Sequence, residues 1–363
     1  QGASPAVCFS LYVPVRKDSE EGETMKKVRV QDAVGMVLCH DMTEIVPGKF
    51  KGRAFKKGHV VKEEDIEKLL DIGKRYLYVW DLEKGYVHED DAAQRMVKAA
   101  AGANISYGEP KEGKIELRAS CRGVLRINID LLYELNGLKD VCFSTIHSGK
   151  TVEEGKVLAG TRVIPLVTEE VMLLQFEKLC EEKGPLIEVL PFRHTKIGIV
   201  TTGSEIADGR IEDKFGPVLK RKAEELDGEI IGQVFPGDEK EEITNAILDF
   251  IGQGADMVQV SGGMSVDPDD VTPSAIRDCG GEAVTYGSPV LPGAMFMLSY
   301  VKGIPVVGLP GCVMYSKRTV FDLAVPRLLA GEKLTREDFI KMAHGGFCMQ
   351  CDPCTYPDCG FGR

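Results

Sequence analysis

Residues 196–205 read KIGIVTTGSE, an apolar β-branched run that passes directly into a turn of Thr, Gly and Ser. Further apolar strands are expected at residues 229–234, 256–260 and 304–307, with amphipathic helical segments between them. Such strands, alternating with helices of about 12 residues, are typical of a parallel sheet covered on both faces. We therefore predict an α/β domain over residues 191–334, with three layers and a mostly parallel sheet.

The helices of this domain are marked by stop and start signals. One is expected to begin at Pro217, a second to end at Gly252, and a third to open at Thr272, where Pro273 suits the first helical turn. A fourth runs through residues 324–329. These positions place a turn after each strand at the same edge of the sheet, where ligands of such sheets bind.

Unusual turns follow three of the strands: TTGSE at 201–205, SGGMS at 261–265 and GLPG at 308–311. Glycine allows backbone N–H groups to approach an anion closely, and neighbouring hydroxyls add further donors. The three turns thus predict a phosphate-binding site that needs no basic patch. The alternative is that they are ordinary turns, which use Gly, Ser and Thr for their conformation.

Carboxylates follow the second turn directly, because Asp267, Asp269 and Asp270 fall within four residues. Mg²⁺ takes one or two carboxylates and completes its shell with water and phosphate oxygens. We predict Asp267 and Asp270 as ligands of Mg²⁺. The alternative is that Asp270 favours the positive end of the helix that opens at Thr272.

The region before the α/β domain, residues 25–190, is predicted to be a β-rich α+β accessory region. Its short strands alternate with glycine and charge, and helices are expected at Glu63–Ile72, at Glu89–Ala101 and, as a linker, from Thr168 to Gly184. Residues 1–24 show neither helical nor strand period and are expected to form a disordered leader. Residues 335–363 are expected to form a helix and a cysteine-rich tail.

Composition excludes several classes of protein. There are 56 Asp and Glu against 45 Lys and Arg, and a net charge of −11 repels nucleic acid and anionic membranes. No apolar run approaches the ~20 residues that span a bilayer. We therefore expect a cytoplasmic protein without nucleic acid or membrane partners.

The cysteines form two groups. There are eleven, an odd number, and most are scattered among apolar neighbours, as in proteins of a reducing compartment. Cys348, Cys351, Cys354 and Cys359 instead fall within the last 16 residues, with two C-x₂-C steps and one C-x₄-C step. This spacing predicts a site for Zn²⁺ or an iron–sulfur cluster, with a mobile tail as the alternative.

Several common catalytic motifs are missing from the sequence. It has no Walker-type Gly-Lys-Ser/Thr loop, no G-x-G-x-x-G after a strand, no H-E-x-x-H and no G-x-S-x-G. The sequence therefore gives no indication of kinase, dehydrogenase, zinc protease or α/β-hydrolase activity.

Four motifs together carry a family resemblance: TTGSEI at 201–206, SGGMSV at 261–266, DVTP at 270–273 and GLPG at 308–311. With them, the carboxyl half resembles the molybdopterin-binding domain of molybdopterin molybdotransferases (the family of the gephyrin E domain) and molybdopterin adenylyltransferases. The likeness covers residue 196 to about residue 331. The β-rich accessory region looks like the accessory domains of molybdotransferases.

The resemblance implies a role in molybdenum cofactor biosynthesis, in which adenylylated molybdopterin is bound and molybdate is inserted with release of AMP, assisted by Mg²⁺. It implies catalytic roles for Glu205, Asp238 and Asp270. A homodimer is also implied, as is typical of molybdotransferases. The residues implied to bind the molybdopterin ligand are Thr202, Gly203, Ser204, Ser261, Gly262, Gly263, Ser265, Pro310 and Gly311.

The chain departs from molybdotransferases where they carry a Lys-Pro-Gly-Lys-Pro signature. Residues 291–295 read Leu-Pro-Gly-Ala-Met, so both lysines are absent. Losing two cations weakens binding of molybdate, a dianion, unless Lys317 or Arg318 substitutes. Two alternatives follow: a non-catalytic molybdopterin carrier that serves a molybdenum hydroxylase, and a nucleotide pyrophosphatase of the competence-damage type, which shares this domain.

Overall fold

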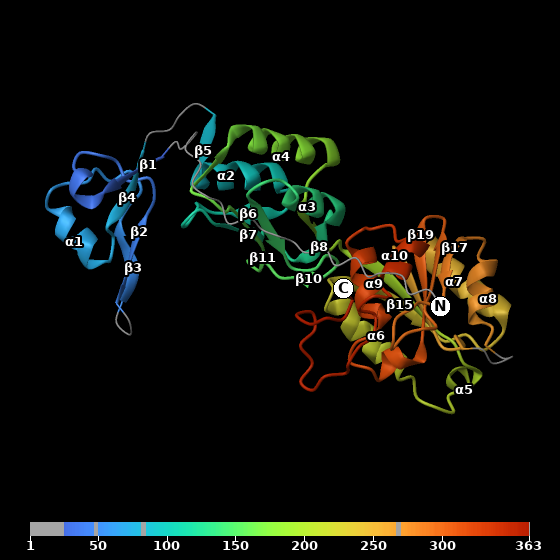
Figure 1. The fold of residues 1–363 in the computed structure, drawn as a ribbon. Coiled ribbons are helices and arrows are strands. Elements are labelled where there is room, and N and C mark those ends of the chain that lie inside the picture. The colour runs from blue at the N-terminus through green and yellow to red at the C-terminus, as the bar shows by residue number, and fades with distance from the viewer. Residues whose placement is uncertain (1–24, 47–49, 81–84, 266–269, 363) are drawn as a thin grey trace, which may run out of the picture. The chain divides into compact units, whose positions relative to one another are not determined.

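The protein forms two compact units in a computed structural model that describes residues 25–46, 50–80, 85–265 and 270–362 (Figure 1). The first unit comprises the described residues up to Glu89 together with Pro165–Val171. The second comprises Asp90–Ile164 and the described chain from Met172 onward. Within these ranges no helix is both long enough and apolar enough to cross a membrane.

This division differs from the predicted boundary at residue 190. Most of the accessory region belongs to the second unit, because polar contacts join it to the carboxyl-terminal part of the chain. Lys156 forms an ion pair with Asp358 (2.9 Å), and the Arg122 guanidinium donates to the backbone carbonyl of Glu225.

The first unit is β-rich, with two antiparallel pairs, β1–β4 and β2–β3. Val30, Leu38, Leu69 and Leu77 are buried in its core. The predicted helix at residues 63–72 is confirmed as α1. The elements of the unit are β1 (Met25–Arg29), η1 (Val30–Asp32), β2 (Met42–Val46), β3 (Phe50–Phe55), α1 (Asp65–Asp71), β4 (Tyr76–Trp80), β5 (Tyr86–His88) and β12 (Val167–Glu169).

The amino-terminal part of the second unit contains two antiparallel sheets, ordered β6-β7-β11-β9 and β10-β8-β13. This confirms the predicted mixture of strands with a few helices, and α2 and α4 match two of the predicted helices. The elements are α2 (Glu89–Ala100), β6 (Ile105–Tyr107), β7 (Ile115–Ala119), β8 (Gly123–Ile127), α3 (Ile129–Asn136), β9 (Val141–Thr145), β10 (Thr151–Val152), β11 (Val157–Val163), α4 (Glu170–Lys183) and β13 (Ile187–Pro191).

The α/β domain that follows is built on a six-stranded sheet in the order β15-β14-β16-β19-β18-β17. The four predicted strands correspond to β14, β15, β16 and β19, and they run parallel as predicted. The sequence did not predict the antiparallel strands β17 and β18 at the edge. The strands are β14 (Thr195–Thr201), β15 (Gly228–Val234), β16 (Met257–Ser261), β17 (Glu282–Tyr286), β18 (Met297–Val301) and β19 (Ile304–Leu309).

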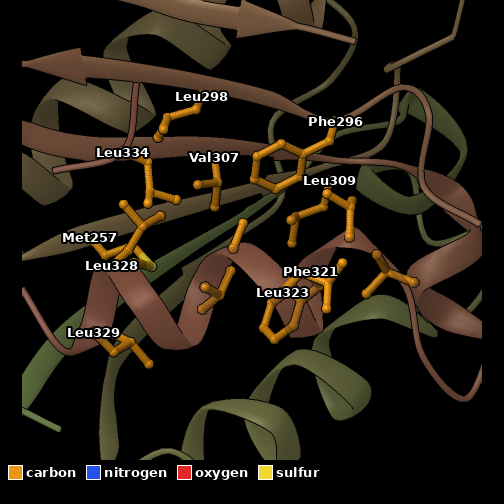
Figure 2. Packing of buried hydrophobic residues seen from close by; sticks show 14 of the residues in the cluster. Met257, Phe296, Leu298, Val307, Leu309, Phe321, Leu323, Leu328, Leu329 and Leu334 are labelled. Carbon is orange, nitrogen blue, oxygen red and sulfur yellow. The ribbon is translucent and has the colours of Figure 1, made fainter. Parts of the chain in front are cut away.

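Helices cover both faces of this sheet, because successive residues of a strand point to opposite faces. Ile197 and Ile199 pack with α6 and α9, whereas Val200 and Val258 pack with α7 and α8. In Figure 2 apolar side chains of α9, such as Phe321, lie in one cluster with those of the sheet. The helices are α5 (Ser204–Ala207), α6 (Phe215–Glu224), α7 (Lys240–Gly252), α8 (Thr272–Asp278), η2 (Gly311–Met314), α9 (Val320–Leu329) and α10 (Arg336–Lys341).

The strand order reverses at β14. β15, the next strand along the chain, pairs with one side of β14, and β16 pairs with the other side. At such a reversal the connections leave in opposite directions, so a crevice opens at the carboxyl ends of the two central strands. The fold therefore places a binding site beyond Thr201 and Ser261.

Replacing Phe296 by alanine is expected to lower the free energy of unfolding by about 3–5 kcal/mol, since this ring is completely buried in the core of the α/β domain. Phe347→Ala is the matched control, because that ring is 71% exposed, and it should cost less than about 0.5 kcal/mol. Urea denaturation followed by circular dichroism measures both. Equal losses would contradict the described packing.

Candidate functional site

A cavity of about 630 Å³ opens at the carboxyl ends of β14 and β16, as the reversal of strand order requires. Its wall includes both glycine turns and the start of α6. We call it the first cavity, and its described lining consists of Thr202, Gly203, Glu205, Ile206, Ile211, Glu212, Lys214, Phe215, Asp238, Gly262, Gly263, Asp270 and Met314.

A second cavity of about 500 Å³ adjoins the first and reaches the turn after β19. The two have Phe215, Gly262, Gly263, Asp270 and Met314 in common, so together they form one groove. The second cavity is also lined by Met264, Ser265, Ala294, Met295, Leu309, Pro310, Gly311, Cys312 and Tyr315. All three turns that the sequence singled out thus border one groove.

Hydrogen bonds hold the first two turns together. The Thr202 N–H donates to the Ser261 carbonyl (2.8 Å), which continues the pairing of β14 with β16 by one residue. The hydroxyls of Thr202 and Thr272 lie 3.3 Å apart within hydrogen-bonding distance, and both side chains are buried. The turn after β14 is therefore fixed to the turn after β16 and to the start of α8.

Gly262 and Gly263 are required by their backbone conformation and their surroundings. Gly262 has φ of +92°, and a Cβ there would lie 2.4 Å from the Thr202 carbonyl oxygen. Gly263 has φ of +54°, and its Cβ would lie 2.8 Å from the Thr272 hydroxyl oxygen. Any larger residue would displace the backbone of the neighbouring turn.

Backbone N–H groups at this edge are available to a ligand. Among the described residues, the N–H groups of Gly203, Gly262 and Gly263 have no hydrogen-bond acceptor. Unpaired N–H groups at glycines are the donors that an oxyanion accepts from in phosphate-binding turns. The glycines therefore meet a conformational requirement of the turns and also leave donors that an anion can use.

The side chains around the first cavity are mainly acidic. Glu205, Glu212, Asp238 and Asp270 line it, against Lys214 as the cation of the described lining. Such a wall repels a bare anion and favours a cation. Any phosphate bound at the glycine turns therefore requires a compensating positive charge.

Asp238 and Ser204 hold each other in place. The Ser204 N–H donates to the Asp238 carboxylate (2.8 Å), and the Asp238 N–H donates to the Ser204 hydroxyl (3.3 Å). Asp238 lines the first cavity, whereas Ser204 does not. Ser204, which was predicted to bind the ligand, is thus hydrogen-bonded to a residue of the cavity wall and is not itself in the described lining.

Ser261, another residue predicted to bind the ligand, lies at the end of β16. Its side chain is fully buried, and its hydroxyl donates to the Thr201 hydroxyl (3.4 Å) inside the sheet. Ser261 is accordingly absent from the described lining of both cavities. Ser261 contributes its carbonyl to the turn, while Ser265, Pro310 and Gly311 line the second cavity as predicted.

Asp270 lies where both cavities meet. It directly precedes Val271, the N-cap residue of α8, so its carboxylate is close to the positive end of that helix as well as to the groove. Asp267, the other predicted Mg²⁺ ligand, lies outside the described residues. Among the described residues, no three His, Cys, Asp or Glu side chains are grouped closely enough to hold a metal ion on their own.

The four carboxyl-terminal cysteines are therefore not gathered into the predicted site for Zn²⁺ or an iron–sulfur cluster. Cys348 and Cys359 are half-buried against the core of the α/β domain, whereas Cys351 and Cys354 are exposed. Burial of Phe361 in the same core holds this segment along the domain surface. Packing of the segment thus separates thiols that lie close together in the sequence.

Lys317 and Arg318, the two cations considered as substitutes for the missing lysines, form ion pairs outside the groove. Ala294 and Met295, in the segment that departs from the lysine signature, do line the second cavity. Lys317 instead pairs with Asp352 (2.7 Å), and Arg318 pairs with Asp322. Neither cation belongs to the described lining of the groove, and both line a separate cavity beside it.

Sequence reasoning missed Lys214, Phe215 and Tyr286. Asp213 accepts hydrogen bonds from the N–H groups of Phe215 and Gly216, so α6 begins two residues earlier than predicted and brings Lys214 to the groove. Asp213, an acidic residue shortly before the helix, was the sequence signal for this earlier helix start.

Tyr286 supports the groove from the unpredicted strand β17. Its hydroxyl lies 3.2 Å from the carbonyl oxygens of both Met264 and Ser265 and donates to them. Burial and the nearby Asp270 carboxylate raise the pKa of this phenol, and the Arg277 guanidinium opposes them. The phenol therefore stays protonated at neutral pH and remains a donor.

Two segments of the chain match known families. Residues 198–330 match the family described as "Probable molybdopterin binding domain". The matched segment contains every predicted residue of the groove. Residues 27–81, in the first unit, match a domain of unknown function, DUF8806.

Curated relatives include CinA-like proteins of mycobacteria. Those of Mycolicibacterium vanbaalenii and Mycobacterium tuberculosis H37Rv are 37% and 34% identical to this chain over 90 residues, or 24% of it. The aligned segment spans only about a fifth (21%) of the length of each relative. The likeness thus concerns about a quarter of this chain and a minor part of each relative.

Solved structures with some likeness include MoaB of Thermus thermophilus, a molybdopterin biosynthesis enzyme. It is 16% identical, with a TM-score of 0.31, over 38% of this chain and 98% of its own. The molybdopterin biosynthesis MoeA protein of Pyrococcus horikoshii is 16% identical, with a TM-score of 0.33, over 85% of this chain and 75% of its own. Both TM-scores are below 0.5, so neither supports an assignment of function.

Gly262→Ala is expected to lower the free energy of unfolding by about 1–3 kcal/mol, because the new Cβ collides with the Thr202 carbonyl at a positive φ. Gly252→Ala is the matched control. No atom lies within 4 Å of its added Cβ, and its place in α7 should make alanine neutral or stabilising by up to about 1 kcal/mol. Thermal unfolding of both variants measures this difference, and equal stabilities would contradict the described turn.

Proposed function

We propose that the α/β domain binds adenylylated molybdopterin in the groove and releases AMP from it during molybdenum cofactor biosynthesis, with molybdate as the second substrate. The observation that carries this proposal is the set of unpaired N–H groups at Gly203, Gly262 and Gly263 beside the Asp270 carboxylate. The match of residues 198–330 to a molybdopterin-binding family supports the choice of ligand.

The size of the groove suits this ligand. Its two adjoining cavities measure about 630 and 500 Å³, which is within the range of sites for cofactor-sized molecules. We infer that the pyrophosphate accepts hydrogen bonds from the glycine turns, where the cavities meet. The adenosine and pterin ends then occupy the two cavities, one on each side of Asp270.

Mg²⁺ fits the donor chemistry of the wall. Mg²⁺ is commonly bound through one or two carboxylates together with substrate phosphates, so it does not require three grouped protein ligands. Asp270 is the carboxylate that both cavities share, and Asp238 is held at the opposite wall by Ser204. When bound, the ion supplies the positive charge that the acidic groove needs to accept pyrophosphate.

Residues of the chain itself bind the phosphates, support the turns and supply one positive charge. The glycine N–H groups bind the phosphate oxygens and orient the bond to AMP, because their positions are fixed by Thr202 and Thr272. The Tyr286 hydroxyl holds the backbone after the second turn. Lys214 at the mouth of the first cavity is the cation placed to meet a leaving phosphate group.

Asp270→Asn should reduce AMP release from adenylylated molybdopterin by at least about 100-fold, since a neutral amide is a poor Mg²⁺ ligand. Asp249→Asn is the matched control, because this exposed residue lies near the end of α7, away from the groove, and it should leave the rate unchanged. Anaerobic incubation with Mg²⁺ and molybdate, followed by chromatography of AMP, measures both. Unchanged release by Asp270→Asn would refute the proposal.

Residues 291–295 lack the two lysines of the molybdotransferase signature, so molybdate binding is the step that their absence is expected to weaken. Release of AMP should therefore be compared with and without molybdate. Dependence on molybdate supports insertion, while tight binding of the pterin with no release supports a carrier that serves a molybdenum hydroxylase. The proposed homodimer is checked in the same preparation by light scattering.

The likeness to CinA-like proteins favours a second candidate, a nucleotide pyrophosphatase. Its substrates also carry a pyrophosphate joined to adenosine, so the same glycine turns and carboxylates would bind them. With ADP-ribose and Mg²⁺ this candidate predicts AMP and ribose 5-phosphate as products. Release of AMP from ADP-ribose faster than from adenylylated molybdopterin would favour this candidate over the first.

A further inference from the structure

A third cavity, of about 400 Å³, lies beside the groove and differs from it in charge. It adjoins the groove at Met314 and Tyr315, and its walls are one face of α6 and the segment that follows β19. We call it the cationic cavity, and its described lining consists of Val218, Arg221, Lys222, Glu225, Val313, Met314, Tyr315, Ser316, Lys317, Arg318 and Cys354.

Cations dominate this lining. Arg221, Lys222, Lys317 and Arg318 face the cavity, and Glu225 is the acidic side chain among the described lining residues. The local excess contrasts with the net charge of −11 of the whole chain and with the acidic wall of the groove. Two segments that are distant in sequence therefore bring four cations together, and Asp322, Asp352 and Glu225 offset only part of their charge.

Two of these cations share one carboxylate. Lys222 and Arg318 lie 2.7 Å and 2.8 Å from the same Asp322 oxygen. Lys222 is only 6% exposed, so its charge is largely removed from water. A single carboxylate neutralises one of the two cations, and the remaining positive charge is held at the wall of the cavity.

The other two cations have weak partners. Lys317 pairs with Asp352, but both side chains are largely exposed, and Arg221 lies 3.9 Å from Glu225. Exposed pairs of this kind contribute about 0–1 kcal/mol, so either cation can turn to a ligand at little cost. The Ser316 side chain adds a hydroxyl donor to the same wall.

We propose that the cationic cavity binds a tetrahedral oxyanion of the phosphate class, with two negative charges. Arg221 and Lys317 contact its oxygens from the two walls, and Lys222 with Arg318 supplies the fixed charge behind them. The site is separate from the pyrophosphate position in the groove and does not depend on the proposed function. Met314 and Tyr315 border both this cavity and the groove. An anion bound in the cationic cavity therefore lies next to side chains that also line the groove.

Binding of inorganic phosphate to the full chain by isothermal titration calorimetry tests this proposal. The double variant Arg221→Ala/Lys317→Ala should weaken binding about tenfold, because two charge-assisted hydrogen bonds are lost. Ser316→Asp should weaken it further, because it places a carboxylate on the wall. The matched control, Lys178→Ala/Lys341→Ala, removes two exposed cations that also pair at i,i+4, and it should bind phosphate as the unaltered chain does.

Glycerol 3-phosphate in a parallel titration distinguishes free phosphate from a phosphate monoester as the bound species. Thermal unfolding of each variant without ligand establishes that it is folded. The proposal is overturned if the unaltered chain binds neither probe at about 10 mM, or if binding is equal in the cavity variants and the control. It is equally overturned if Asp270→Asn, and not the double variant, removes phosphate binding, since the phosphate then lies in the groove.

Discussion

The hydrogen bond from the Thr202 N–H to the Ser261 carbonyl is the contact on which the candidate site depends. It joins the turns after β14 and β16. These two parallel strands lie where the order of strands in the sheet reverses. With the turns held together, three glycines whose N–H groups lack an acceptor among the described residues line one cavity, and Asp270 lines it with them. A binding site arises here because the topology leaves these strand ends uncovered and the turn residues fix their geometry.

Charge divides the surroundings of this site into two parts. The groove itself has an acidic wall, so it accepts a phosphate-containing ligand only together with a cation such as Mg²⁺. The wall of the adjoining cationic cavity is positively charged instead. Lys222 and Arg318 both pair with Asp322, so one carboxylate faces two cations. The chain thus lacks the two lysines of the molybdotransferase signature in the groove but places positive charge one cavity away.

The sequence predicted the parallel strands and the groove turns because both depend on local patterns. Continuous apolar runs located β14 and β16, and Gly262 and Gly263 marked positions where no side chain fits. It could not predict the direction of Ser261 or of Lys317, because these depend on strand pairing and on the distant Asp352. The cysteine spacing predicted a metal site that the described residues do not form, again because a tertiary contact decides the outcome. Packing of Phe361 into the core determines where that segment lies.

Amide hydrogen exchange, with and without adenylylated molybdopterin and Mg²⁺, tests the central claim most directly. The N–H groups of Gly203, Gly262 and Gly263 have no acceptor among the described residues, so they should exchange quickly in the free protein. If they bind the ligand's phosphates, exchange at residues 202–205 and 262–265 should slow by at least about tenfold, while α3 and α4 stay unchanged. Complex formation that leaves these two turns unprotected would contradict the account.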